Sequence, residues 1–193
     1  MKTDIVLAGV GGQGILSIAS ILGEAALCEN LFLKQAETHG MSQRGGAVVS
    51  HVRISDKEIA ADLIPLGSAE IILSVEPMEA LRYLPFLKKG GYVVTNITPF
   101  ENIPNYPNLD SILEEIRKQP HFIAIDADSI AKEIGNRRIS NVVMLGAATP
   151  FIQIEPEKIE AGIERVFQRK GDPVVQLNLK AYRAGMQFAL ENK

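Results

Sequence analysis

The most constraining feature of this 193-residue sequence is a glycine-rich segment that lies directly between a short apolar run and an amphipathic stretch. The run I-V-L-A at residues 5–8 has the length and composition of a buried strand. Residues 15–27 carry apolar side chains at helical spacing. Between them, G-V-G-G-Q-G at residues 9–14 fits the G-x-G-x-x-G pattern of a dinucleotide-binding turn. This order of elements predicts an α/β fold with strands and helices in alternation.

Each glycine in this first loop has a physical use. One permits a tight turn, one lets a ligand approach the backbone, and one lets the helix pack closely on the strand. The N-terminus of the following helix would direct unpaired N–H groups and a partial positive charge toward an anion such as phosphate. Glu37 lies about where a ribose-binding acid would stand. A tight turn without any ligand explains the same glycines and stays an alternative.

A second glycine-rich segment, E-T-H-G-M-S-Q-R-G-G at residues 37–46, precedes the apolar run A-V-V. Arg44 stands beside two glycines, so its planar guanidinium can be presented while the backbone stays accessible. His39 and Gln43 add groups that donate or accept hydrogen bonds. For Arg44 alone, a surface hairpin is the simpler interpretation. Ordering ten nearly non-apolar residues is costly, which favours a functional role for the whole segment.

The rest of the chain alternates apolar strands with amphipathic helices and contains no repeat or linker. We expect one domain over residues 1–193, with a three-layer, mostly parallel, Rossmann-like sheet, flanking helices and C-terminal helices. In residues 47–54, alternation predicts a strand whose face bearing Val49, His51 and Arg53 is the wetter one. We expect K-K-G-G at residues 88–91 to end a helix over residues 78–87. The other predicted strands are residues 31–36, 71–75, 92–96 and 122–125, and the other helices are residues 109–118, 129–134, 141–151, 156–167 and 174–190.

Composition excludes several classes of function. The net charge of −3 and the absence of a basic cluster argue against nucleic acid. Cys28 is the only cysteine, so the chain forms no internal disulfide and cannot hold an iron–sulfur cluster by itself. We expect Cys28 to be a packing residue. The three histidines lack metal-ligand spacing, so we expect no metal site. Without a signal peptide or a membrane span, we expect a cytoplasmic protein.

Both loops, with H-V-R-I-S at residues 51–55 and N-V-V-M-L-G at residues 141–146, resemble the gamma subunit or domain of 2-oxoacid:ferredoxin oxidoreductases. The resemblance covers nearly the whole chain. The form M-S-Q-R-G-G is most similar to that of the small (beta) subunits of indolepyruvate:ferredoxin oxidoreductases. The resemblance implies oxidative decarboxylation of a 2-oxoacid, an arylpyruvate in the closest case, to an acyl-coenzyme A, with electrons passing to ferredoxin.

The resemblance also implies a division of labour between subunits. This chain lacks the cysteines of a cluster and the G-D-G…N-N pattern of a thiamine diphosphate site. Thiamine diphosphate, magnesium and [4Fe–4S] clusters are therefore expected on a larger partner subunit, with coenzyme A as co-substrate and ferredoxin as an indirect partner. We expect this chain to close over the partner's active site and to be inactive alone.

No residue is predicted to be catalytic. A stand-alone NAD(P)-binding oxidoreductase is one alternative, favoured by the first loop and Glu37, and a purely structural assembly subunit is another. We expect the cofactor-binding or substrate-facing residues to be Gly9, Gly11, Gly12, Gln13, Gly14, His39, Gln43, Arg44, Gly45 and Gly46.

Overall fold

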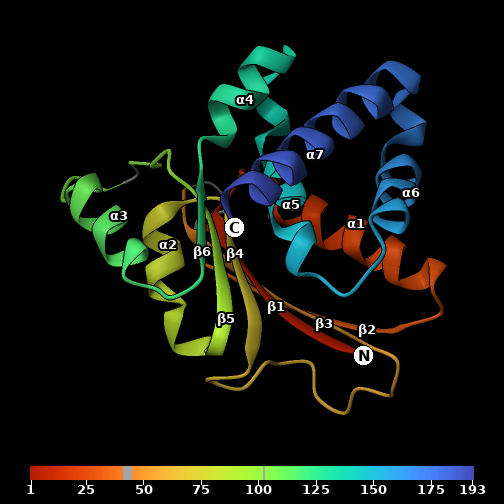
Figure 1. Cartoon of the computed structure of the whole chain (residues 1–193), viewed down its shortest axis with the longest axis horizontal. Helices are drawn as coiled ribbons and strands as arrows, with labels where there is room; N and C mark the ends of the chain where they lie inside the picture. The colour runs from red at the N-terminus through yellow and green to blue at the C-terminus, as the bar shows by residue number, and fades with distance from the viewer. Residues whose placement is uncertain (41–44, 102) are drawn as a thin grey trace.

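A computed structural model describes residues 1–40, 45–101 and 103–193 of the chain. Its centre is a six-stranded sheet in the order β2-β3-β1-β4-β5-β6 (Figure 1). The strands are β1 (Lys2–Val10), β2 (Phe32–His39), β3 (Ala47–Ser55), β4 (Ala69–Ser74), β5 (Leu87–Asn96) and β6 (Phe122–Ile125). The glycine-rich turn thus follows one of the inner strands.

One strand runs against all the others that the structure describes. β1 pairs parallel with β4, β4 with β5, and β5 with β6. β3 is antiparallel to both of its neighbours, β1 and β2. The short connection between β2 and β3 allows this hairpin-like reversal, whereas parallel strands need a longer crossover. The prediction of a mostly parallel α/β sheet is confirmed, with β3 as the exception.

Helices cover both faces of the sheet and make three layers (Figure 1). The larger apolar core joins the sheet to α1 (Ile15–Cys28), α4 (Ala127–Ile134), α5 (Ser140–Ala148), α6 (Pro156–Phe167) and α7 (Asp172–Asn192). On the other face, α2 (Pro77–Arg82) and α3 (Leu109–Arg117) pack against β5. Short 3₁₀ turns complete the chain at η1 (Leu84–Phe86), η2 (Arg137–Ile139), η3 (Thr149–Phe151) and η4 (Gln168–Lys170).

A segment without regular structure, residues 56–68, packs on the second face of the sheet in one apolar cluster with residues of η1. Its one fully buried apolar side chain, Ile64, packs with Val49 on the sheet. The Ile64 N–H donates to Nδ1 of His51 at 3.1 Å. Val49 and His51 are therefore buried, and the predicted wetter face of β3 is wrong for these two residues. The reason is tertiary: the connection that follows β3 folds back over both side chains.

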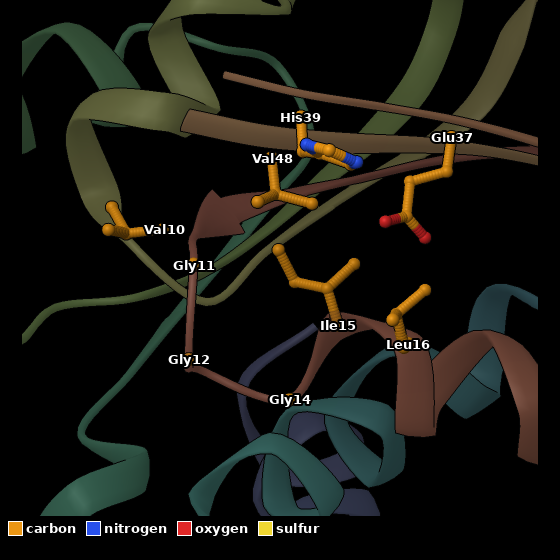
Figure 2. A pocket seen from close by; sticks show the side chains of 9 residues that line it. All are labelled: Val10, Gly11, Gly12, Gly14, Ile15, Leu16, Glu37, His39 and Val48. Carbon is orange, nitrogen blue, oxygen red and sulfur yellow. The ribbon is translucent and has the colours of Figure 1, made fainter. Parts of the chain in front are cut away.

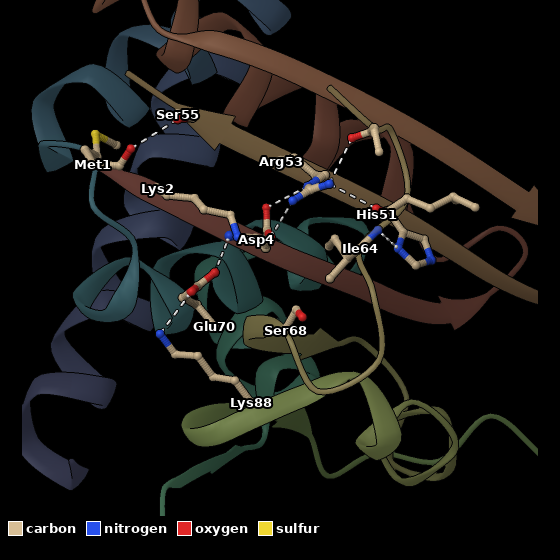
Figure 3. A network of polar contacts seen from close by, with 12 residues as sticks. Met1, Lys2, Asp4, His51, Arg53, Ser55, Ile64, Ser68, Glu70 and Lys88 are labelled. Atoms are coloured by element: carbon tan, nitrogen blue, oxygen red, sulfur yellow. Dashed lines mark hydrogen bonds and ion pairs between the residues drawn. The ribbon is translucent and has the colours of Figure 1, made fainter. Parts of the chain in front are cut away.

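An ion-pair network fixes this segment (Figure 3). The guanidinium of Arg53 donates to both carboxylate oxygens of Asp4, at 2.9 and 3.0 Å. It also donates to the carbonyls of Ala61 and Leu63, at 2.9 and 3.0 Å. Lys2 places its ammonium 2.8 Å from the same carboxylate, which is only 1% exposed. Buried charge is stabilised here by several donors at once.

The predicted helix over residues 78–87 is wrong in its second half. α2 ends at Arg82, and Pro85 lies in the 3₁₀ turn that follows. Proline has no N–H and crowds the preceding turn, so the helix cannot continue through it. The K-K-G-G run then lies inside β5 instead of capping a helix, and the β4–β5 register shifts near its start.

Within the described part of the chain, none of the helices is both long enough and apolar enough to cross a membrane. Cys28, at the end of α1, is half-buried and forms no disulfide.

Candidate functional site

The first glycine loop turns the chain from β1 into α1 at the carboxyl edge of the parallel strands. Gly12 and Gly14 have φ angles of 103° and 82°, which favour glycine over residues with a side chain. Gly14 caps α1, so the first N–H groups of that helix have no partner within it. Gly9 serves packing, because a Cβ there would lie 2.4 Å from Cγ2 of Val75.

Gln13 braces this loop from inside. Its Oε1 accepts from the Val10 N–H at 2.8 Å, and its Nε2 donates to the Val75 carbonyl at 3.4 Å. The amide thus links the ends of two neighbouring strands, β1 and β4. Gln13, expected from the sequence to face a ligand, therefore uses one donor and one acceptor position of its amide within the chain.

Backbone hydrogen bonds join the two glycine loops. The Gly11 N–H donates to the Gly46 carbonyl at 2.8 Å, and the Gly45 N–H donates to the Gly11 carbonyl at 3.4 Å. The structure therefore brings together two segments that the sequence only placed near each other along the chain. It also occupies the Gly11 N–H, which is no longer available to an anion. Gln43 and Arg44 lie outside the described residues.

An apolar pocket of about 420 Å³ opens between the loops and the start of α1 (Figure 2). Glu37 and His39 extend into it from β2, since alternate residues of that strand share the face of Val48. His39 is exposed, with Nδ1 3.2 Å from the Gly40 carbonyl oxygen. We call this the aliphatic pocket; its lining is Val10, Gly11, Gly12, Gly14, Ile15, Leu16, Glu37, His39 and Val48.

A second, more polar cavity of about 550 Å³ lies on the other side of the first loop. We call it the cationic cavity. It collects residues from the carboxyl ends of β4, β5 and β6, from the loop and from the helices above the sheet. Its polar or charged lining includes Gln13, Ser17, Asn96, Asp128, Asn136, Arg137, Arg138, Ser140, Asn141, Lys170 and Asn178.

Three cationic side chains, Arg137, Arg138 and Lys170, make the lining of this cavity positively charged. Among the ion pairs of the described chain, none involves Arg137, Arg138 or Lys170. The Lys170 ammonium lies 5.2 Å from the centre of the Phe167 ring. Asp128 is the carboxylate in the lining, and its Oδ2 accepts from Asn96 at 2.8 Å. Uncompensated guanidinium and ammonium groups suit an anion with several oxygens.

The sequence interpretation missed these cations. The adjacent pair Arg137-Arg138 follows Asn136, whose Oδ1 accepts from the Arg138 N–H at 3.0 Å and fixes the turn. Two arginines in a capped turn just before an apolar helix were a usable signal. No sequence signal pointed to Lys170, because only the fold brings this residue near the first loop.

Asn141 connects the cationic cavity to the glycine loop. Its Nδ2 donates to the Gly14 carbonyl at 3.0 Å, across 127 residues of sequence. A Cβ on Gly14 would lie only 2.5 Å from that nitrogen. Both this close contact and the positive φ angle therefore require glycine at position 14. The N-V-V-M-L-G segment therefore begins with a residue that holds the loop in place.

The described residues contain no group of three or more His, Cys, Asp or Glu side chains that could hold a metal ion. Glu37 lies near the first loop, as the NAD(P) alternative requires. However, its strand is separated from β1 by the antiparallel β3, unlike the adjacent parallel strands of the dinucleotide fold.

Comparison with known proteins places the chain. The family model described as pyruvate ferredoxin/flavodoxin oxidoreductase matches residues 4–188. The indolepyruvate oxidoreductase subunit IorB of Pyrococcus horikoshii is 40% identical, over 97% of this chain and 96% of its own length. The subunit of the same name from Archaeoglobus fulgidus is also 40% identical, over 100% of this chain and 98% of its own.

Solved structures agree with this placement. The gamma subunit of a keto/oxoacid ferredoxin oxidoreductase from Geobacter sulfurreducens has a TM-score of 0.71 at 26% identity, covering 98% of this chain and 99% of its own. The fold also matches 2-oxoglutarate:ferredoxin oxidoreductase from Magnetococcus marinus, with a TM-score of 0.78 at 23% identity. That match covers 98% of this chain but only 31% of the longer one. The resemblance seen in the two glycine loops is confirmed, and the chain belongs to the pyruvate ferredoxin/flavodoxin oxidoreductase family.

Proposed function

We propose that this chain is the small subunit of an indolepyruvate:ferredoxin oxidoreductase and that it completes the active site of a larger subunit. The overall reaction converts a 2-oxoacid and coenzyme A into an acyl-coenzyme A and carbon dioxide, and the two electrons released reduce ferredoxin. Thiamine diphosphate, magnesium and iron–sulfur clusters reside on the larger subunit in this proposal. Full-length similarity to indolepyruvate oxidoreductase subunits supports the choice of substrate.

One observation carries the proposed role: the first glycine loop, hydrogen-bonded to the second, lies between an apolar pocket and a cationic cavity. We infer that this edge of the sheet faces the reaction centre of the partner. The cationic cavity would receive phosphate groups of coenzyme A, since Arg137, Arg138 and Lys170 are free to pair with them. The structure of the fold neighbour from Magnetococcus marinus holds 2-oxoglutarate, coenzyme A and succinyl-CoA, which is consistent with this.

The test reconstitutes the complex from its subunits. Indolepyruvate-dependent dye reduction by the larger subunit is measured with and without this chain. We expect turnover to require the chain, and full activity of the larger subunit alone would refute the proposal.

A double variant Arg137→Ala with Arg138→Ala then tests the anion site. We expect the KM for coenzyme A to rise at least about tenfold, corresponding to about 1.4 kcal/mol, with little change in the KM for indolepyruvate. Arg169→Ala is the matched control, because Arg169 is an exposed cation near Lys170 that does not line the cavity. Equal effects of the two changes would contradict the assignment.

A further inference from the structure

The aliphatic pocket has one polar wall and several apolar ones. Ile15, Leu16 and Val48 supply hydrocarbon, and the glycine backbone leaves the floor free of side chains. Its volume of about 420 Å³ lies in the range of small-molecule sites. Leu16 is 53% exposed at its edge, so apolar surface there remains uncovered in the isolated chain.

Glu37 is the one carboxylate in this lining. Figure 2 shows its side chain reaching from β2 toward the start of α1, over the apolar walls. It takes part in none of the hydrogen bonds or ion pairs between described residues. An ionised carboxylate only accepts hydrogen bonds, so a ligand here must bring a donor. It also repels a second carboxylate, which makes an acidic side chain a poor occupant.

These features select one kind of side chain among the 2-oxoacids named for the relatives. The distal carboxylate of 2-oxoglutarate would face Glu37, and the methyl group of pyruvate would leave the pocket unfilled. An indole ring is flat and apolar and carries a single N–H donor. Its apolar faces match the aliphatic walls, and its donor matches the unpaired acceptor.

We propose that the aliphatic pocket holds the aryl side chain of the 2-oxoacid and that Glu37 accepts a hydrogen bond from the indole N–H. This inference rests on the proposed function, because the 2-oxo group must reach a reaction centre on the larger subunit. It makes Glu37 a specificity-determining residue of this chain. Glu37 is exposed in the isolated chain, so this role requires that the larger subunit covers the pocket. A covered site that hydrogen-bonds a substrate N–H discriminates against analogues that lack it.

The test uses the reconstituted complex with two aryl substrates, indolepyruvate and phenylpyruvate, which has no ring donor. In Glu37→Leu, we expect kcat/KM to fall about tenfold or more for indolepyruvate and to change less than about twofold for phenylpyruvate. Glu37→Gln keeps an acceptor oxygen, so most of the preference should remain. Glu58→Leu is the matched control, an exposed glutamate of segment 56–68 outside this pocket.

A second variant tests the walls. Val48→Phe fills the pocket, and we expect kcat/KM for both aryl substrates to fall about tenfold or more. Co-elution of the two subunits in size exclusion is measured for every variant. An unchanged ratio of the two kcat/KM values in Glu37→Leu would overturn the inference, as would full activity of Val48→Phe. Loss of co-elution in either pocket variant would also overturn the inference, because it would indicate that the pocket binds a side chain of the larger subunit instead of the substrate. In each case, a requirement for this chain in turnover would still support the proposed function.

Discussion

Replacement of Gly185 by alanine is expected to separate the two central helices of the larger core. Gly185 lies in α7 against α5, where an added Cβ would stand 1.9 Å from the Val143 carbonyl oxygen. The contact is reciprocal, since a Cβ on Gly146 would stand 2.0 Å from the Tyr182 carbonyl oxygen. Both obstacles are backbone atoms, which cannot rotate away as a flexible side chain can. The helices must therefore move apart by more than 1 Å to reach the 3.4–4 Å of ordinary contact.

The expected cost is large for one methyl group. Overpacking a core usually costs about 1–3 kcal/mol, and this site lies at the upper end because both helices bury core residues along the contact. Alanine returns about 1 kcal/mol through its higher helix propensity. We expect a net loss of about 2 kcal/mol in the free energy of unfolding. For a chain of this size, that corresponds to a Tm lower by about 4–8 °C.

Denaturant unfolding followed by circular dichroism measures this loss. Gly23→Ala is the matched control, since Gly23 also lies inside a helix but an added Cβ there meets only a methyl carbon of Leu33 at 3.1 Å. We expect that control to stay within about 1 kcal/mol of the unchanged protein, because the leucine can shift and the helix gains propensity. Equal stability of the two variants would show that α5 and α7 do not meet through glycine.

Three further changes test the buried polar groups. Among the described residues, Arg53→Leu leaves Lys2 as the one remaining charged partner of the Asp4 carboxylate, and we expect a loss of about 3 kcal/mol in the free energy of unfolding. Burial, with a smaller contribution from Arg53, lowers the pKa of His51, so the unfolded chain binds the proton more readily. Stability should therefore fall as pH drops below about 6.5, and pH-dependent unfolding should show a shallower fall in His51→Gln. Burial and the carboxylate of Glu76 raise the pKa of Tyr106, so ultraviolet titration of Glu76→Gln should show one tyrosine ionising at lower pH than before.

Much of the fold could be predicted because local signals agreed with the final packing. β6 has the predicted bounds, as a short apolar run between turn residues, and α6 begins at Pro156 and ends at Phe167 as predicted. The error at residues 78–87 arose where signals conflicted. Apolar spacing favoured a helix, but Pro85 ended it, and β5 then extended back to Leu87 through pairing with Ala69. That pairing is a long-range interaction, which the local spacing of apolar residues cannot reveal.

The candidate site was predictable only in part, for a similar reason. Each glycine loop leaves a pattern in the sequence, and the hydrogen bonds between Gly11 and residues 45–46 follow from the pairing of β1 with β3. The cationic cavity joins Arg137 and Lys170 to the first loop across more than a hundred residues, so no spacing rule points to it. Charges that gather through folding alone need the three-dimensional structure.

The glycine loop explains why one chain can present two different chemical surfaces to one partner. Gly12 and Gly14 line both the aliphatic pocket and the cationic cavity, so the loop is a wall only one backbone thick. A side chain at Gly14 would collide with Asn141, which holds the loop from the cavity side. An aryl group and a phosphate group can therefore be bound a short distance apart without sharing an environment. Because no acid, base or metal site is needed for this, the proposed contribution of the chain is the selection and placement of substrates, and the same proposal assigns bond making and breaking to the larger subunit.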